Sequence, residues 1–160
     1  MIEYIPRWIV RSARVHFRNA AQAAGFPMFY EGMGRPANFG ENYYEFRVDG
    51  PYLQKHTKNF SCHFFEVNIL CTCFVKDDLD LIDKMAGDIF KKFSEPITIQ
   101  RLGDTNETIY NDNSTVGCAV VFTPDGKLAR ISRFGALGPS QSMSQAAVHG
   151  WFKLELTNAN

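Results

Sequence analysis

The residues best suited to chemistry lie in FSCHFFEVNILCTCFVKDD, residues 60–78, where cysteine and histidine occur among apolar side chains. Cys71 and Cys73 could supply thiolates to a metal ion, and His63 an imidazole. Alternate positions from residue 65 are apolar, however, which predicts a half-buried β-strand. On one strand His63 would lie about 26 Å from Cys71, because each residue advances the chain by about 3.3 Å. These two residues therefore cannot bind the same ion.

Cys71 and Cys73 share a face of the predicted strand, but they supply only half of a tetrahedral metal site. The other ligands would have to come from Cys118 or His149 on other strands, and no CxxC or HxxxH spacing supports this. Free cysteine is among the most buried residue types. We therefore predict that Cys71 and Cys73 are small buried hydrophobic side chains and not metal ligands.

Catalytic signatures are also missing from the sequence. The four histidines are spread over a predicted helix, a loop, a strand edge and the start of the last strand: His16, His56, His63 and His149. None lies in a recognisable nucleophile or acid–base motif. The sequence thus favours a protein that is not an enzyme. If a catalytic site exists, His149 and Cys118 are the first candidates for it.

Length and composition limit the class of protein. A chain of 160 residues suffices for one domain that buries roughly 70% of its unfolded surface, without disulfides or a metal. Four cysteines in mostly strand-like positions fit a reducing compartment. The start of the chain does not read as a signal peptide, and no apolar run approaches about 18 residues. We expect a protein that is made in the cytosol and does not enter a membrane.

Charge is balanced overall but segregated along the chain. Seventeen basic and seventeen acidic residues cancel, which argues against a dedicated nucleic-acid-binding protein. Residues 1–35 carry five arginines and two glutamates, whereas residues 77–112 carry nine acids and four bases. Such segregation suits a molecule whose basic surface meets the acidic surface of another copy. The alternative is that the two segments pair within one chain.

Residues 6–24 are predicted to form the first helix, with proline in its first turn and glycine after its end. One face of this helix carries apolar residues, and another carries four arginines at spacings of four, three and four: Arg7, Arg11, Arg14 and Arg18. A charged stripe is commonly a solvated face. Arginine is also the preferred partner of carboxylates and phosphates, so this arginine stripe is our main candidate for an interface.

A second helix is predicted over residues 79–93, capped by Asp77 or Asp78, with Asp80 in its first turn. Strands are predicted at 28–31, 42–49, within 60–78, at 97–102, 117–123, 127–133 and 149–157, with the pair around Pro-Asp-Gly forming a hairpin. Long loops are expected at 50–59, 103–115 and 134–148. The predicted fold is a single α+β domain over residues 1–160, an antiparallel sheet with two helices packed on one face.

The order of these segments resembles the tail terminator proteins of long-tailed bacteriophages. The similarity lies in an N-terminal amphipathic helix ending at AAQAAGFPMFYEG, the strand EFRVDGP, the strand HFFEVNILCTCFVKDDLD that leads into the helix LIDKMAGDIFKKF, and the terminal strand HGWFKLEL. The resemblance covers most of the chain as an order of elements.

This resemblance implies a structural virion protein that is assembled in the host cytoplasm and has neither catalytic activity nor a cofactor. It would form a ring, usually of six copies, that caps the tail tube, stops its polymerisation and contacts the head-completion proteins. DNA would pass through the ring without sequence-specific binding. Combined with the charge pattern, the resemblance gives a set of expected interface residues: Arg7, Arg11, Arg14, Arg18, Asp77, Asp78, Asp80, Arg133 and Phe134.

Two other classes remain open from the sequence. A small nucleic-acid- or ligand-binding module would stack bases on strand aromatics such as Tyr43, Tyr44 and Phe46, beside Arg47. A small cytosolic enzyme would instead contain a pocket with titrating groups of perturbed pKa.

Overall fold

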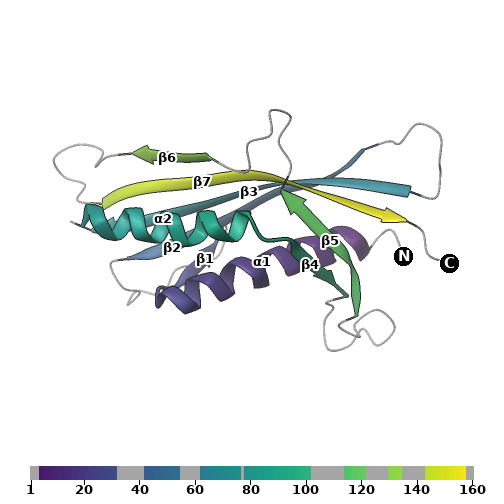
Figure 1. Ribbon diagram of the computed structural model, residues 1–160, viewed down its shortest axis with the longest axis horizontal. Helices are drawn as coiled ribbons and strands as arrows, with labels where there is room; N and C mark the ends of the chain where they lie inside the picture. Colours follow the sequence, from purple (N-terminus) through teal and green to yellow (C-terminus); the bar gives the residue numbers. More distant parts are fainter. Residues whose placement is uncertain are drawn as a thin grey trace.

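The computed structural model describes residues 4–31, 42–54, 62–76, 78–101, 114–121, 130–134 and 143–157. These residues form two helices and seven strands (Figure 1). In chain order they are α1 (Ile5–Ala24), β1 (Met28–Tyr30), β2 (Tyr43–Gln54), β3 (Cys62–Lys76), α2 (Leu79–Phe93), β4 (Ile97–Gln100), β5 (Thr115–Val121), β6 (Arg130–Phe134) and β7 (Met143–Thr157).

The strands form one twisted sheet in the order β1-β2-β3-β7-β5-β4, with β6 also paired to β7. The prediction of a purely antiparallel sheet was wrong. β1 pairs in parallel with β2, placing Met28 opposite Tyr44, while the other pairs are antiparallel. The sheet is therefore mixed, and it curls around the helices (Figure 1). A single α+β domain is consistent with this architecture.

The predicted hairpin between β5 and β6 was also wrong. Both strands pair with β7, which is long enough to hold them one after the other along the same edge: β6 lies against residues 145–149 and β5 against residues 152–153. The residues between β5 and β6, including the Pro-Asp-Gly turn, lie outside the described ranges. The Pro-Asp-Gly turn motif did not identify the partner of either strand, because β7 forms the backbone hydrogen bonds that β5 and β6 would have made with each other.

All three predicted loops overlap strands. β7 begins at Met143, so residues 143–148 of the loop expected at 134–148 belong to a strand, and Phe134 ends β6. β2 continues to Gln54, past an irregularity between Asp49 and Tyr52, which removes residues 50–54 from the loop expected at 50–59. Thr115 starts β5, and residues 102–113 lie outside the description. Small and polar residues suggested loops, but pairing with β3 stabilises residues 52–54 and 143–148 as strands.

Both helices cover the same face of the sheet (Figure 1), as predicted. The alternation in β3 explains this arrangement, since its odd positions from Phe65 to Val75 are buried beneath the helices and its even positions are half-buried on the other side. Cys71 and Cys73 are wholly buried, which confirms their expected role as core residues. We call the side of the sheet without helices the open face.

The core is centred on Phe17 of α1, whose side chain is fully buried. Its ring centroid lies 5.3 Å from that of Phe46, 4.9 Å from that of Phe93 and 6.3 Å from that of Phe152. One α1 side chain thus contacts β2, α2 and β7 at once. These aromatic contacts hold the two helices and the sheet in a fixed arrangement.

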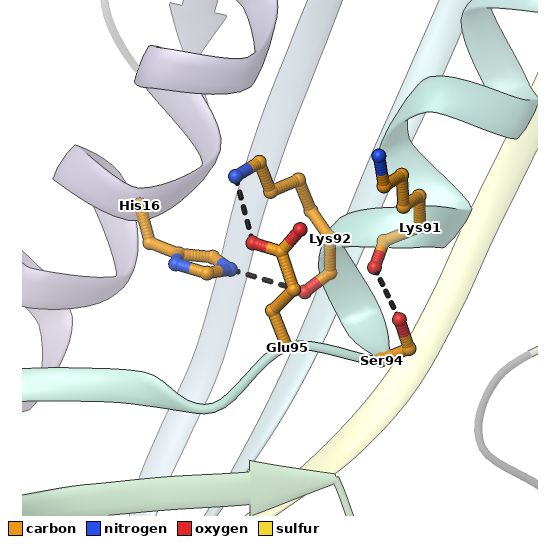
Figure 2. A network of polar contacts seen from close by, with 5 residues as sticks. All are labelled: His16, Lys91, Lys92, Ser94 and Glu95. Carbon is orange, nitrogen blue, oxygen red and sulfur yellow. Dashed lines mark hydrogen bonds and ion pairs between the residues drawn. The ribbon is translucent and has the colours of Figure 1, made fainter.

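A polar network joins α1 to the C-terminal end of α2 (Figure 2). His16 Nε2 donates a hydrogen bond to the backbone carbonyl oxygen of Lys92 at 3.0 Å, and Lys92 Nζ donates to Glu95 at 2.7 Å. The hydrogen bond from Lys92 lowers the pKa of the Glu95 carboxyl. Ser94 Oγ donates to the carbonyl oxygen of Lys91 at 2.6 Å, so the network satisfies carbonyl groups that the helix end leaves open.

Candidate subunit interface

The arginine stripe of α1 lies on the side of the helix opposite its buried face. Arg14 and Arg18 are exposed, whereas Arg7 and Arg11 are half-buried and have interactions within the chain. The Arg14 guanidinium lies 5.0 Å from the centroid of the Tyr30 ring, a cation–π contact that ties α1 to the edge strand β1. Of the four arginines, Arg18 is thus the one with the clearest access to a partner molecule.

The acidic residues at the start of α2 have different roles. Asp78 is the N-cap, and its Oδ1 accepts a hydrogen bond from the backbone N–H of Leu81 at 3.0 Å. Such a cap stabilises a helix by about 1 kcal/mol, so Asp78 has a structural role here. Asp80 is exposed in the first turn. Asp77 lies outside the described residues.

Arg133 and Phe134 are in β6, opposite Ala146 and Gln145 of β7. Their side chains are not among the described ones. Their position at the edge of the sheet is compatible with the interface expected from the sequence, and their assignment to it stays a prediction.

An apolar surface beside them was missed by the sequence analysis. Leu79 is 71% exposed, Phe90 36% and Ile131 of β6 36%. Leu79, Asp83 and Phe90 lie on one flank of α2 by helical spacing, and α2 contacts β6. We call these four residues the α2–β6 strip. The sequence did contain a sign of this strip, because Leu79 and Phe90 are apolar residues that lie just outside the predicted apolar face of the helix.

The helix that carries the arginine stripe, α1, lies on one side of α2, and β6 lies on the other (Figure 1). Where β6 is paired, the sheet runs β1-β2-β3-β7-β6, so β1 and β6 are its two edges there. Arg14 contacts β1, and Ile131 belongs to β6. α1 and β6 accordingly flank α2 on opposite sides. A basic surface therefore lies near one edge, and an apolar surface that includes Asp83 lies near the other.

The two residues suggested as catalytic candidates do not meet. His149 is on the open face of β7, where its Nε2 hydrogen bonds to Asn68 Oδ1. Cys118 is on β5, which joins β7 only near Lys153. Cys118 itself pairs with Thr98 of β4, away from His149. Burial, and then the charge of Arg130, lower the pKa of His149.

Two further properties bear on function. Among the described residues, no group of three or more histidine, cysteine or acidic side chains is arranged to hold a metal ion. Neither α1 nor α2 combines the length and the apolar composition that a membrane crossing requires.

Thiol labelling should distinguish Cys71 and Cys73 from Cys118. Burial raises the pKa of the Cys73 thiol to about 12 and that of Cys71 well above its usual value, whereas Cys118 is exposed. Because the thiolate is the reactive form, we expect Cys118 to react with a soluble thiol reagent at pH 8 within minutes, and Cys71 and Cys73 only after unfolding. Peptide mapping after labelling, with and without urea, measures this. Rapid labelling of Cys71 in native protein would contradict its burial.

Comparisons with known proteins identify the fold and nothing more specific. No protein-family model matches the sequence, and no curated protein is similar to it. Eleven chains of solved structures do match the fold. One of them aligns over 96% of this chain and 96% of its own, with a TM-score of 0.50 and 10% sequence identity, and its name states no activity, ligand or partner. At this level of identity the similarity concerns the fold alone.

Proposed function

We propose that this protein is a structural assembly protein that forms a head-to-tail ring, and that it acts as a tail terminator in the virion of a long-tailed bacteriophage. In this role it would be assembled in the host cytoplasm, cap the tail tube, stop its polymerisation and contact the head-completion proteins. Following the resemblance, the ring would contain six copies and surround DNA without reading its sequence.

The order of elements supports the proposal. The helix ending near Ala24, the strand containing EFRVDGP, the long strand leading into α2 and the terminal strand all occur at the positions that carried the resemblance. The strands among them belong to one sheet, and both helices pack on one face of that sheet.

The observation that carries the proposal is the pair of different surfaces at opposite edges. Closed rings with one copy per repeat use heterologous contacts, in which one patch of each copy binds a different patch of the next. The exposed end of the arginine stripe, Arg14 and Arg18, complements the charge of Asp83, which is exposed in the α2–β6 strip and also has an interaction within the chain. Leu79, Phe90 and Ile131 would supply apolar area, which contributes roughly 25 cal/mol for each Å² removed from water.

The alternative of a base-stacking module loses two of its proposed residues. Tyr44 and Phe46 are on the helix-facing side of β2 and are at most 1% exposed, so neither can stack on a base. Tyr43 is on the open face but is only 7% exposed, and its ring stacks on Phe74 with a centroid distance of 4.7 Å. The aromatic platform expected from the sequence is therefore not available to a ligand.

Native mass tests the proposal directly. We expect light scattering over a range of protein and salt concentrations to find a ring-sized species, either alone or after addition of tail-tube protein, and negative-stain images to show closed rings. Because part of the contact is ionic, assembly should weaken as salt increases. A monomer at every concentration that also ignores tail-tube protein would overturn the proposal.

A further inference from the structure

The open face contains a groove of about 440 Å³ that ring assembly does not explain. Its lining residues come from four strands, β2, β3, β7 and β6: Arg47, Asp49, Asn68, Leu70, Thr72, Arg130, Ser132, Gln145, Ala147 and His149. The groove lies across the sheet from both helices, because these residues alternate with the buried ones beneath α1 and α2. Its volume is within the range of small-molecule sites.

One row of residues crosses this groove. Strand register places Arg47 opposite Leu70, Leu70 opposite His149, and His149 opposite Arg130. An arginine thus stands at each end of the row, with three strand spacings, about 14 Å, between their backbones. Long side chains that extend inward from both ends can reach one group at the centre of the groove.

Apart from Asp49, the residues that line the groove between the arginines are apolar or neutral. Leu70 and Ala147 provide apolar surface, and hydroxyl and amide side chains surround it. His149 Nε2 donates to the Asn68 Oδ1 atom, which fixes the imidazole tautomer and leaves the Asn68 amide nitrogen able to donate to a ligand. Burial, and then the charge of Arg130, lower the pKa of His149, which favours the neutral form of its imidazole.

The two arginines at the ends of the groove differ in their ion pairs within the chain. Arg47 Nε is 3.1 Å from Glu31 Oε2, but both side chains are 54% exposed, so water screens this pair and it contributes little stability. Arg130 is exposed and has no ion pair among the described residues. Asp49 is the acid in the lining, and its interaction with the Tyr52 hydroxyl raises the pKa of that tyrosine. A ligand that competes for Arg47 and binds Arg130 must itself be an anion.

We infer that this groove binds the phosphate group of a small phosphomonoester, of nucleotide size at most. Two guanidinium groups match the double negative charge of a phosphomonoester better than the single charge of a carboxylate, and arginine binds phosphate oxygens in bidentate fashion. The neutral donors can bind the remaining oxygens, and the apolar floor accommodates the rest of the molecule. This inference does not depend on ring assembly, since the groove is on the opposite face from α1 and α2.

Calorimetric titration of the full chain tests the inference with four probes: adenosine monophosphate, adenosine, inorganic phosphate and a ten-residue oligothymidylate. We expect adenosine monophosphate to bind at least 30-fold more tightly than adenosine. R130Q should lower its affinity about tenfold, and R47Q should lower it by a similar or smaller factor, as expected for lost charge-assisted hydrogen bonds. Inorganic phosphate should bind weakly and show the same dependence on Arg130.

K91Q is the matched control, because it removes an exposed positive charge of α2 on the other side of the sheet. Its affinity for adenosine monophosphate should stay within twofold of that of the wild type. Equal binding of adenosine and its monophosphate, an unchanged affinity in R130Q, or no binding of any probe would each overturn the inference. Binding of the oligothymidylate without the monophosphate would also overturn it, in favour of a nucleic-acid strand. Melting curves of both groove variants should match the wild type, because Arg47 and Arg130 are exposed.

Discussion

Replacing Phe17 with alanine should lower the free energy of unfolding by about 3–5 kcal/mol. Phe17 is fully buried, and its ring packs against Phe46, Phe93 and Phe152. The substitution would leave a cavity where α1, α2 and two strands meet, and the surrounding aromatic rings can fill it only partly. Because small domains are stable by only about 5–15 kcal/mol, the loss would remove a large share of the total stability.

Urea denaturation followed by circular dichroism measures this change. Phe17→Leu, which keeps most of the volume, should cost clearly less than the alanine variant. Phe90→Ala is the matched control, because this phenylalanine is on the partly exposed flank of α2 and should change monomer stability by less than about 1 kcal/mol. A cost below 1 kcal/mol for Phe17→Ala would show that the core is not centred on this residue.

Reversing the charge of Arg18 should disrupt the proposed ring while leaving the monomer folded. Arg18 is exposed on α1, and Asp83 lies in the α2–β6 strip that the next copy would present to it. Arg18→Glu would place two carboxylates together at every contact of the ring. We expect the dissociation constant of each contact to rise about tenfold or more. Sedimentation velocity should therefore show a shift from ring to monomer, with an unchanged melting temperature.

A second substitution distinguishes a direct contact from a general change of charge. Asp83→Arg alone should also weaken assembly, and the combination of Arg18→Glu with Asp83→Arg should restore much of it, because the ion pair is re-formed with its signs exchanged. Lys91→Glu changes the charge of α2 equally but lies away from the strip, so it should leave assembly intact. Full assembly of Arg18→Glu would rule out the arginine stripe as the ring contact.

Arg11 and Arg14 would be less informative targets than the sequence indicated. Arg11 is half-buried and has an interaction within the chain, and Arg14 stacks on Tyr30. A reversal at either position would change contacts within the monomer as well as those with a partner. Their spacing on the helix could not distinguish the four arginines. The contact between Arg14 and Tyr30 of β1 is known only from the folded chain.

The sequence by itself determined the local elements. Alternation of apolar residues predicted β3 and the burial of Cys71 and Cys73, and the acid before residue 79 with lysines at 91 and 92 predicted α2 and its cap. These features depend on residue spacing within one segment and on the first and last turns of a helix. They can therefore be read without knowledge of distant contacts.

Only the tertiary structure decided which strands pair and in which direction. The parallel β1, the pairing of β6 with β7 and the length of β7 all depend on backbone hydrogen bonds between distant segments, and side-chain alternation is the same in either direction. The α2–β6 strip and the open-face groove were hidden for the same reason. Each is assembled from residues whose separation in the sequence says nothing about their distance in the fold, so the packing of the sheet and its helices brings them together.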